Sequence, residues 1–211
     1  MEALKKVEGE FWSMKKIFEK IYQTGKFFGV WGNADNTKML AKIPIQKFIN
    51  NLHNGVVKWG DYFLIGYNGR PLYIFEKENH EQWAFVEDEA ERNLEKLFKK
   101  IDPNKTILVT HAPPFRVLDQ VEKDYRKYAI GTYGEKAKDG HIGSMAFRKI
   151  VEKYQPFLHI FGHIHESRGI KRLGETICVN TGCLGVHGEY AITSINNNNK
   201  VTVQFNRIDQ T

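Results

Sequence analysis

The most informative part of the sequence is Phe157-Leu158-His159-Ile160-Phe161-Gly162-His163-Ile164-His165-Glu166. Its branched and aromatic residues predict a short buried strand that runs into Gly162 and then into two histidines. Because side chains alternate along a strand, His163 and His165 are expected to project from the same face at its end. Two neutral imidazoles side by side form a half-site for a first-row transition metal, provided that other ligands converge on them. The alternative is a pair of surface histidines on an edge strand.

The composition is that of an ordinary globular protein. The 211 residues, 41% hydrophobic and 27% charged, can bury a full core, and without a repeat or a linker they predict a single domain over 1–211. No apolar run is long enough to span a membrane, there is no signal peptide, and two cysteines are too few for a disulfide scaffold. We therefore expect a cytoplasmic protein without a membrane partner. The formal charge of +6 is compatible with a phosphate-bearing partner, nucleic acid included, but does not require one.

The rest of the chain alternates helical and strand patterns, which predicts an α/β fold. Helices are predicted over 3–24, 36–53, 81–100 and from Gly143-Ser144 to 154. Strands are predicted over 26–31, 71–75, 106–110, 176–179, 190–195 and 201–205, with a hairpin formed by 56–59 and 62–67.

Two more predicted strands end in polar side chains. The strand over 26–31 stops at Gly32-Asn33-Ala34-Asp35, and the strand over 106–110 ends in His111 before Pro113-Pro114. Open α/β sheets place their chemistry at these carboxyl ends. The alternatives are an Asx-type turn with a helix N-cap for Asn33 and a loop cap for His111.

The segment over 115–142 shows no clear periodicity and is rich in charged residues, tyrosines and glycines. A long polar loop in a compact domain is either disordered or functional. We expect it to lie over the site, where its basic and aromatic residues would bind a phosphate and a base. His141, next to the helix start at Gly143-Ser144, is the predicted substrate-binding residue.

The order of these side chains resembles that of the calcineurin-like metallophosphoesterase superfamily, in particular its small microbial phosphodiesterase-like members. The third motif of that family matches Gly32-Asn33-Ala34-Asp35, the fourth matches Val109-Thr110-His111-Ala112-Pro113-Pro114, and the fifth, Gly-His-x-His, matches Gly162-His163-Ile164-His165. Val179-Asn180-Thr181-Gly182-Cys183 resembles the Asn-Pro-Gly-Ser turn that often follows. The resemblance runs from about residue 15 to the end of the chain.

The resemblance implies a two-sheet sandwich flanked by helices. It also implies two divalent metal ions, of manganese, iron, nickel or zinc, which activate a hydroxide for attack on a phosphate ester or a nucleotide-like substrate. Carried over by position, Asn33, His111 and His163 would hold one ion and His165 the other.

The N-terminus departs from this pattern, because residues 1–32 contain neither aspartate nor histidine. The first two family motifs, Asp-x-His and Gly-Asp, are absent, and Ala34 stands where many members have the histidine that protonates the leaving group. We therefore expect an N-terminally incomplete domain that lacks two strands and is prone to self-association through the exposed edge at 26–31. It would hold at most one ion well and be a poor enzyme, with its catalytic residues unassigned.

Two other interpretations stay open. The first is a non-catalytic remnant of the fold that serves as a binding or interaction module. The second is an unrelated cupin-like His-x-His metal protein, although the helices between the strands argue against it.

Overall fold

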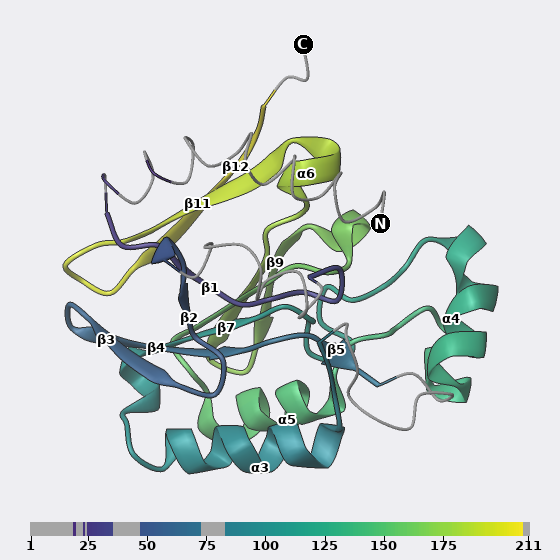
Figure 1. Ribbon diagram of the computed structural model, residues 1–211, viewed down its shortest axis with the longest axis horizontal. Helices are drawn as coiled ribbons and strands as arrows, with labels where there is room; N and C mark the ends of the chain where they lie inside the picture. Colours follow the sequence, from purple (N-terminus) through teal and green to yellow (C-terminus); the bar gives the residue numbers. More distant parts are fainter. Residues whose placement is uncertain (1–18, 20–22, 24, 36–46, 73–82, 209–211) are drawn as a thin grey trace.

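The computed structural model describes residues 19, 23, 25–35, 47–72 and 83–208 (Figure 1). Nearly all of the helix predicted over 3–24 lies outside these residues. The first part of the helix predicted over 36–53 and most of the edge strand predicted over 71–75 lie outside them too.

A six-stranded sheet forms the centre of the described chain, in the order β3-β4-β7-β8-β10-β9. These strands are β3 (Val56–Trp59), β4 (Tyr62–Tyr67), β7 (Thr106–Thr110), β8 (Leu158–Phe161), β10 (Thr176–Asn180) and β9 (Gly169–Leu173). The four inner strands β4, β7, β8 and β10 run parallel, whereas β3 and β9 are antiparallel edges. The carboxyl ends of the inner strands therefore meet at one edge of the sheet, which is where this architecture places a functional site.

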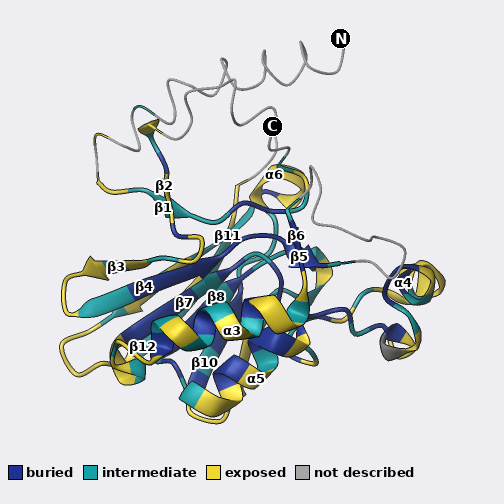
Figure 2. Ribbon diagram, turned by 60° about the horizontal axis from the view of Figure 1, so that its bottom comes forward, coloured by how far each residue is buried: buried dark blue, intermediate teal, exposed yellow. Residues whose placement is uncertain are grey.

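Helices α3 (Glu87–Phe98) and α5 (Met145–Tyr154) lie side by side and cover one face of the sheet (Figures 1 and 2). Each turns an apolar stripe inward, so that Leu94 and Phe147 join Leu108 of β7 in one buried cluster. The carboxylate of Glu87 accepts hydrogen bonds from the Ser144 hydroxyl and from the first backbone N–H groups of α5. The start of one helix thus caps the start of the other.

The start predicted for α3 is wrong by six residues. Ala84–Phe85 forms strand β6, parallel to β5 (Arg70–Pro71), because the carbonyls of Trp83 and Phe85 accept backbone hydrogen bonds from Arg70 and Leu72. These partners lie more than ten positions away in the sequence. The apolar residues Trp83, Phe85 and Val86 fall within the helix predicted over 81–100, but they lie before the first residue of α3.

The hairpin of β11 (Glu189–Ile195) and β12 (Val201–Arg207) covers the opposite face of the sheet. Its apolar residues Ile195, Val201, Val203 and Phe205 pack against residues of the inner strands. Together these layers form a mixed α/β fold with a central sheet flanked by helices, and the predicted fold class is confirmed.

A small parallel pair, β1 (Phe28–Gly29) with β2 (Asn50–Asn51), lies beside this core. The strand predicted over 26–31 is thus reduced to two residues, and the end of the helix predicted over 36–53 is a strand instead. Tertiary contacts decide this, since Asn50 and Leu52 donate backbone hydrogen bonds to the carbonyls of Phe27 and Gly29.

The segment over 115–142 contains regular structure, contrary to expectation. Helix α4 (Arg126–Tyr133) stands out from the body of the molecule, and its Ala129 and Tyr133 are buried against Ile142 and Ile164 (Figure 1). The remaining short elements are η2 (Pro103–Lys105), η3 (Lys123–Tyr125), η4 (Glu135–Ala137), η5 (His165–Ser167) and α6 (Leu184–His187). None of the helices in the described ranges has the length and apolar character needed to cross a bilayer.

Candidate metal centre

Asn33 is presented by a tight turn that follows β1. The carboxylate of Asp35 accepts a hydrogen bond from the backbone N–H of Gly32 at 2.6 Å, and the N–H of Asp35 donates back to the carbonyl of Gly32 at 3.1 Å. The turn is tied to the end of β4, because the N–H of Trp31 donates to Oδ1 of Asn68 and the N–H of Gly69 donates to the carbonyl of Trp31. Residues 32–35 therefore form a β-turn that the carboxylate of Asp35 closes, and this turn brings Asn33 to the carboxyl edge of the sheet.

His111 follows directly after β7. Its N–H donates to the carbonyl of Tyr67 at the end of β4, and its carbonyl accepts from the N–H of Gly162 beyond β8. The residue is thus fixed between two neighbouring strand ends by backbone hydrogen bonds. The imidazole lies against Gly32, where a Cβ atom would come within 2.6 Å of Cε1 of His111.

His163 lies just beyond β8 in a strained turn. Strand β8 ends at Phe161, the φ of His163 is 67°, and the N–H of Ile164 donates to the carbonyl of Gly162 at 2.8 Å. This i to i+2 hydrogen bond around a residue of positive φ is the rarer and more strained form of γ-turn, and strain of this kind concentrates at functional sites. The expectation that His163 and His165 share one face of a strand is wrong, because the chain turns between them and His165 begins η5.

Three of the predicted ligands meet at the Nε2 atom of His111. This atom lies 2.7 Å from Oδ1 of Asn33 and 3.0 Å from Nδ1 of His163. The two imidazole rings have centroids 4.7 Å apart. Asn33 and His163 lie 78 and 52 positions from His111 in the sequence and are in direct contact with it. His111 and His163 follow the neighbouring parallel strands β7 and β8, whereas Asn33 reaches them from the turn that is tied to the end of β4.

Both histidines are held in the neutral form. Burial, followed by the charges of His165 and Arg70, lowers the pKa of His111 to about 4. Burial, followed by His111, Arg70 and His165, lowers the pKa of His163 well below its ordinary value. Because a metal ion binds the unprotonated nitrogen, neutral imidazoles are ready to act as ligands at neutral pH.

The Arg70 side chain, which is 0% exposed, was not anticipated from the sequence, since its position depends on the β5–β6 pairing.

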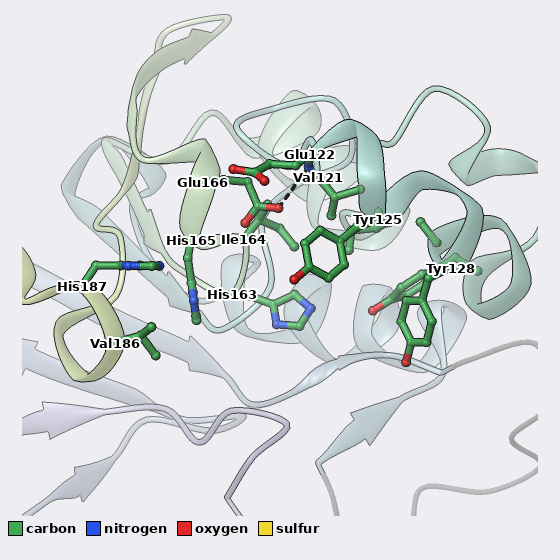
Figure 3. Close-up of a pocket in the computed structure, with 13 residues that line it drawn as sticks. Val121, Glu122, Tyr125, Tyr128, His163, Ile164, His165, Glu166, Val186 and His187 are labelled. Carbon is green, nitrogen blue, oxygen red and sulfur yellow. Dashed lines mark hydrogen bonds between the residues drawn. The ribbon is translucent and has the colours of Figure 1, made fainter.

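His165 lies near this group and borders two cavities. A cavity of about 330 Å³ is lined by His111, His163 and His165 together with the strand ends, and a larger one of about 480 Å³ is lined by His163, His165 and His187. Figure 3 shows the three histidines along the larger cavity. The ring centroids of His165 and His187 are 5.9 Å apart. Among the described residues, no group of three or more His, Cys, Asp or Glu side chains is placed to hold a metal ion.

The predicted substrate residue His141 has a different environment. Its Nδ1 lies 2.7 Å from Oδ1 of Asp119, and its ring lies edge-on to Phe115. Asp119 is completely buried, and its other oxygen accepts hydrogen bonds from the N–H groups of Arg116 and Gly143. His141 is not among the described residues that line the two cavities.

Asn180 supports the turn that carries the histidines. It is completely buried at the end of β10, and its Nδ2 donates to the carbonyls of Ile164 and Leu118. Its Oδ1 accepts from the N–H of Gly182. The sequence indicated a turn at Asn180 but not this role, because nothing near it in sequence shows which carbonyls it reaches.

Comparisons with known proteins show which proteins this chain is similar to. The family model of the metallophosphoesterases of the calcineurin superfamily matches residues 36–206. An uncharacterised protein of Methanocaldococcus jannaschii is 29% identical over 171 residues, which cover 78% of this chain and 69% of that protein. Metallophosphoesterase domain-containing protein 1 of Homo sapiens is 32% identical over 106 residues, or 50% of this chain and 28% of that protein.

A solved crystal structure has a TM-score of 0.68 to this chain at 23% identity, and the match covers 96% of this chain and 75% of the other. That likeness shows the fold. The family model, which spans more than half of the sequence, shows that the chain belongs to the calcineurin superfamily of metallophosphoesterases.

Proposed function

We propose that this protein is a metal-dependent phosphoesterase, acting as a phosphodiesterase or phosphatase, with a divalent ion held by Asn33, His111 and His163. The observation that carries the proposal is the contact of Nε2 of His111 with both Oδ1 of Asn33 and Nδ1 of His163, at 2.7 and 3.0 Å. Family membership supports a hydrolase of this general kind.

The donor set fits a cation better than it fits a closed hydrogen-bond network. A neutral imidazole has a single N–H, so Nε2 of His111 either shares one proton between the two contacts or carries none and leaves Oδ1 of Asn33 without a donor. In addition, Nε2 of His163 is buried and has no hydrogen-bond partner among the described residues. An amide oxygen and two imidazole nitrogens are suitable ligands for manganese, iron, nickel or zinc.

When bound, such an ion would supply charge neutralisation at the phosphate and a lowered pKa for an attacking water. The residues of the chain would contribute neutral ligands, which add no negative charge to repel the phosphate. His165 would face a second ion at the border of the two cavities, where the described residues offer fewer ligands. We therefore propose that one ion is held well by the described residues and that turnover by the 211-residue chain is slow.

Calorimetric titration of the 211-residue chain with Mn²⁺ or Ni²⁺ tests the proposal. One site of micromolar affinity or better is expected, and His111→Ala and Asn33→Ala should weaken it at least tenfold. His53→Ala is the control, since His53 is an exposed histidine that packs on Tyr67 and Trp83 and is not among the described residues that line the cavities. An affinity that is unchanged by His111→Ala would show that the ion is held elsewhere.

Hydrolysis of bis-p-nitrophenyl phosphate in the presence of Mn²⁺ is the second measurement. We expect low turnover that His163→Ala abolishes. Turnover that survives His163→Ala would place the chemistry outside this site.

A non-catalytic binding module is the alternative function. It is favoured by one observation, that no third His, Cys, Asp or Glu side chain joins the cluster among the described residues. The two functions are distinguished by adding Mn²⁺ and phosphate ester together, because a module would bind them without turnover.

A further inference from the structure

The larger cavity, of about 480 Å³, has an aromatic wall. Tyr125, at the end of η3, and Tyr128, in α4, border it with 60% and 65% of their surfaces exposed. Figure 3 shows both rings facing the same space as His163. The nearby Tyr133 belongs to the apolar core of this segment, whereas Tyr125 and Tyr128 do not. The two exposed rings are therefore accessible to a ligand in the cavity.

The charge of this wall is opposite to that of the whole chain. The sequence has a formal charge of +6, yet the described residues that line the cavity include Glu122 and Glu166 and neither lysine nor arginine. One oxygen of Glu166 accepts the backbone N–H of Glu122, whereas the Glu122 carboxylate has no partner among the described residues (Figure 3). Arg126, which lies between the two tyrosines in the sequence, has its guanidinium against Gly140 instead. Negative charge without a cationic partner therefore faces the cavity.

The interior of the cavity is apolar apart from one orphaned atom. Ala129, Ile142 and Ile164 line it and are buried. Nε2 of His163, which also lines the cavity, is buried and has no hydrogen-bond partner in the part of the chain that the structure describes. Because water is scarce in such a space, attraction between a cation and the carboxylates is stronger there than on an open surface.

Two kinds of ligand fit this lining poorly. A phosphate or another anion would be repelled by the two carboxylates, since no lysine or arginine of the lining compensates them. A metal ion would lack ligands, because the described residues contain no group of three or more His, Cys, Asp or Glu side chains placed to hold one. An organic cation needs no such ligand set, and a volume of about 480 Å³ is in the range of pockets that enclose small molecules.

We propose that this cavity binds an organic ammonium ion, of the alkylated kind that choline represents, with the rings of Tyr125 and Tyr128 against its methyl groups. The face of an aromatic ring attracts a cation, and the attraction is larger when the cation is partly desolvated. Glu122 and Glu166 balance the charge of the ion. The proposal goes beyond the phosphoesterase function and does not depend on it.

Choline, titrated into the metal-free 211-residue chain and followed by the NMR chemical shifts of the protein, tests the proposal. Saturable binding in the millimolar range or tighter is expected. The matched ligand is the carbon analogue of choline, in which a tert-butyl group replaces the trimethylammonium group. It has the same shape without the charge, so it should bind more weakly than choline, and only the binding of choline should weaken as salt is added.

Variants of the wall separate the contribution of the rings from that of the charge. Tyr125→Ala and Tyr128→Ala should each weaken choline binding roughly 2- to 30-fold, whereas Tyr125→Phe and Tyr128→Phe should keep most of it because they keep the ring. Glu122→Gln should weaken the binding of choline and leave that of the carbon analogue unchanged. Glu175→Gln is the matched control, since Glu175 is an exposed carboxylate outside the cavity lining.

Three results would overturn the proposal. They are the absence of saturable binding at tens of millimolar choline, equal affinities for choline and its carbon analogue, and a choline affinity that the alanine variants of both tyrosines leave unchanged. Because the chain is metal-free in these titrations, each of these results would leave the His111-dependent binding of Mn²⁺, and with it the proposed phosphoesterase function, to stand or fall by its own test.

Vesicles distinguish a free ammonium ion from a lipid headgroup, which carries the same group. Co-sedimentation with phosphatidylcholine vesicles that is lost in Tyr125→Ala would identify the ligand as a headgroup. Choline binding without co-sedimentation would identify it as a free ion.

Occupation of the cavity should also affect the candidate metal centre. His163 and His165 line both cavities, so a bound ammonium ion and a metal ion would lie near each other and repel. Choline should therefore weaken the binding of Mn²⁺, and Mn²⁺ should weaken the binding of choline by the same factor, because coupling between two sites is reciprocal. Calorimetric titration of each ligand in the presence of the other measures the factor. A choline affinity that saturating Mn²⁺ leaves unchanged would overturn this coupling.

Discussion

A Cβ atom on Gly32 would lie 2.6 Å from Cε1 and 2.8 Å from Nδ1 of His111, so glycine at this position makes room for the imidazole. The first residue of the Gly-Asn-Ala-Asp turn thereby sets the orientation of a ring that is 79 positions away in the sequence. The same ring presents its Nε2 to Asn33, the next residue of that turn.

Gly32→Ala is expected to displace the His111 ring and to weaken binding of Mn²⁺ at least tenfold. Because the ring borders a cavity, it can move, and the free energy of unfolding should fall by only about 1–3 kcal/mol. Calorimetric metal titration and urea unfolding measure the two effects. Gly131→Ala in α4 is the control, since a Cβ atom there meets nothing within 4 Å, and it should leave metal binding unchanged.

Asn180→Ala should loosen the turn between His163 and His165. The carbonyls of Ile164 and Leu118 would lose their donor, at a cost of about 1–3 kcal/mol for each buried group that stays unsatisfied. We expect a lower urea midpoint together with weaker Mn²⁺ binding. Asn206→Ala removes an exposed hydrogen bond to Gln204 and should do neither. If the two variants behaved alike, Asn180 would have no special role in holding the turn.

Asp119→Asn should destabilise the segment that bears α4. Two backbone N–H groups and Nδ1 of His141 point at this buried carboxylate, and an amide cannot accept from all three. A loss of about 1–3 kcal/mol and faster amide hydrogen exchange across 116–143 are expected. Asp139→Asn is the control, because the side chain of Asp139 is 69% exposed and pairs with Arg116 at 3.5 Å. The prediction that His141 binds substrate is tested alongside, since His141→Ala would then reduce the hydrolysis of bis-p-nitrophenyl phosphate.

His159 should make the protein sensitive to acid. Thr110 has one hydroxyl proton, which it donates to the carbonyl of Ala112 at 2.6 Å, so Nε2–H of His159 donates to Thr110 Oγ1. Nδ1 of His159 is then an unprotonated, buried atom without a partner among the described residues. Burial lowers the pKa of His159 to about 3 from the ordinary 6.5, because a second proton would place a charge in the core.

Proton linkage gives the direction in which stability changes with pH. The unfolded chain binds a proton at His159 below about pH 6.5 and the folded chain does not, so stability is full above that pH and falls as the pH drops toward 3. The loss is up to about 1.4 kcal/mol per pH unit for this group. His159→Gln, which keeps a donor for Thr110 but does not titrate, should reduce the slope of unfolding free energy against pH between 6 and 4. An unchanged slope would assign the acid sensitivity to the other histidines whose pKa is lowered by burial, which are His53, His111 and His163 among the described residues.

Local sequence patterns alone were enough to predict several of the central strands and their order along the chain. Elements whose character is local were predicted correctly, such as the apolar strand β7, the hairpin of β3 and β4 around Gly60, and helix α5 with its Ser144 cap. Because the carboxyl ends of parallel strands meet at one edge, the positions of His111 and His163 after two apolar strands were enough to predict that their side chains lie together. Asn33 was also predicted to join them, but it does so through the backbone and side-chain bonds of its turn to Asn68 and Gly69, since β1 is not part of the central sheet.

Only the tertiary structure decided features that depend on partners distant in the sequence. Residues 84–85 and 50–51 became strands because other segments supplied their hydrogen bonds, against their local helical pattern. The strained turn at His163 is stable because Asn180 and His111 hold the backbone on either side of it, and neither contact leaves a trace near residue 163 in the sequence. The cavity beside it exists because helix α4 brings tyrosines up to the histidines of the turn after β8 and of α6, an arrangement set by packing and not by any local pattern.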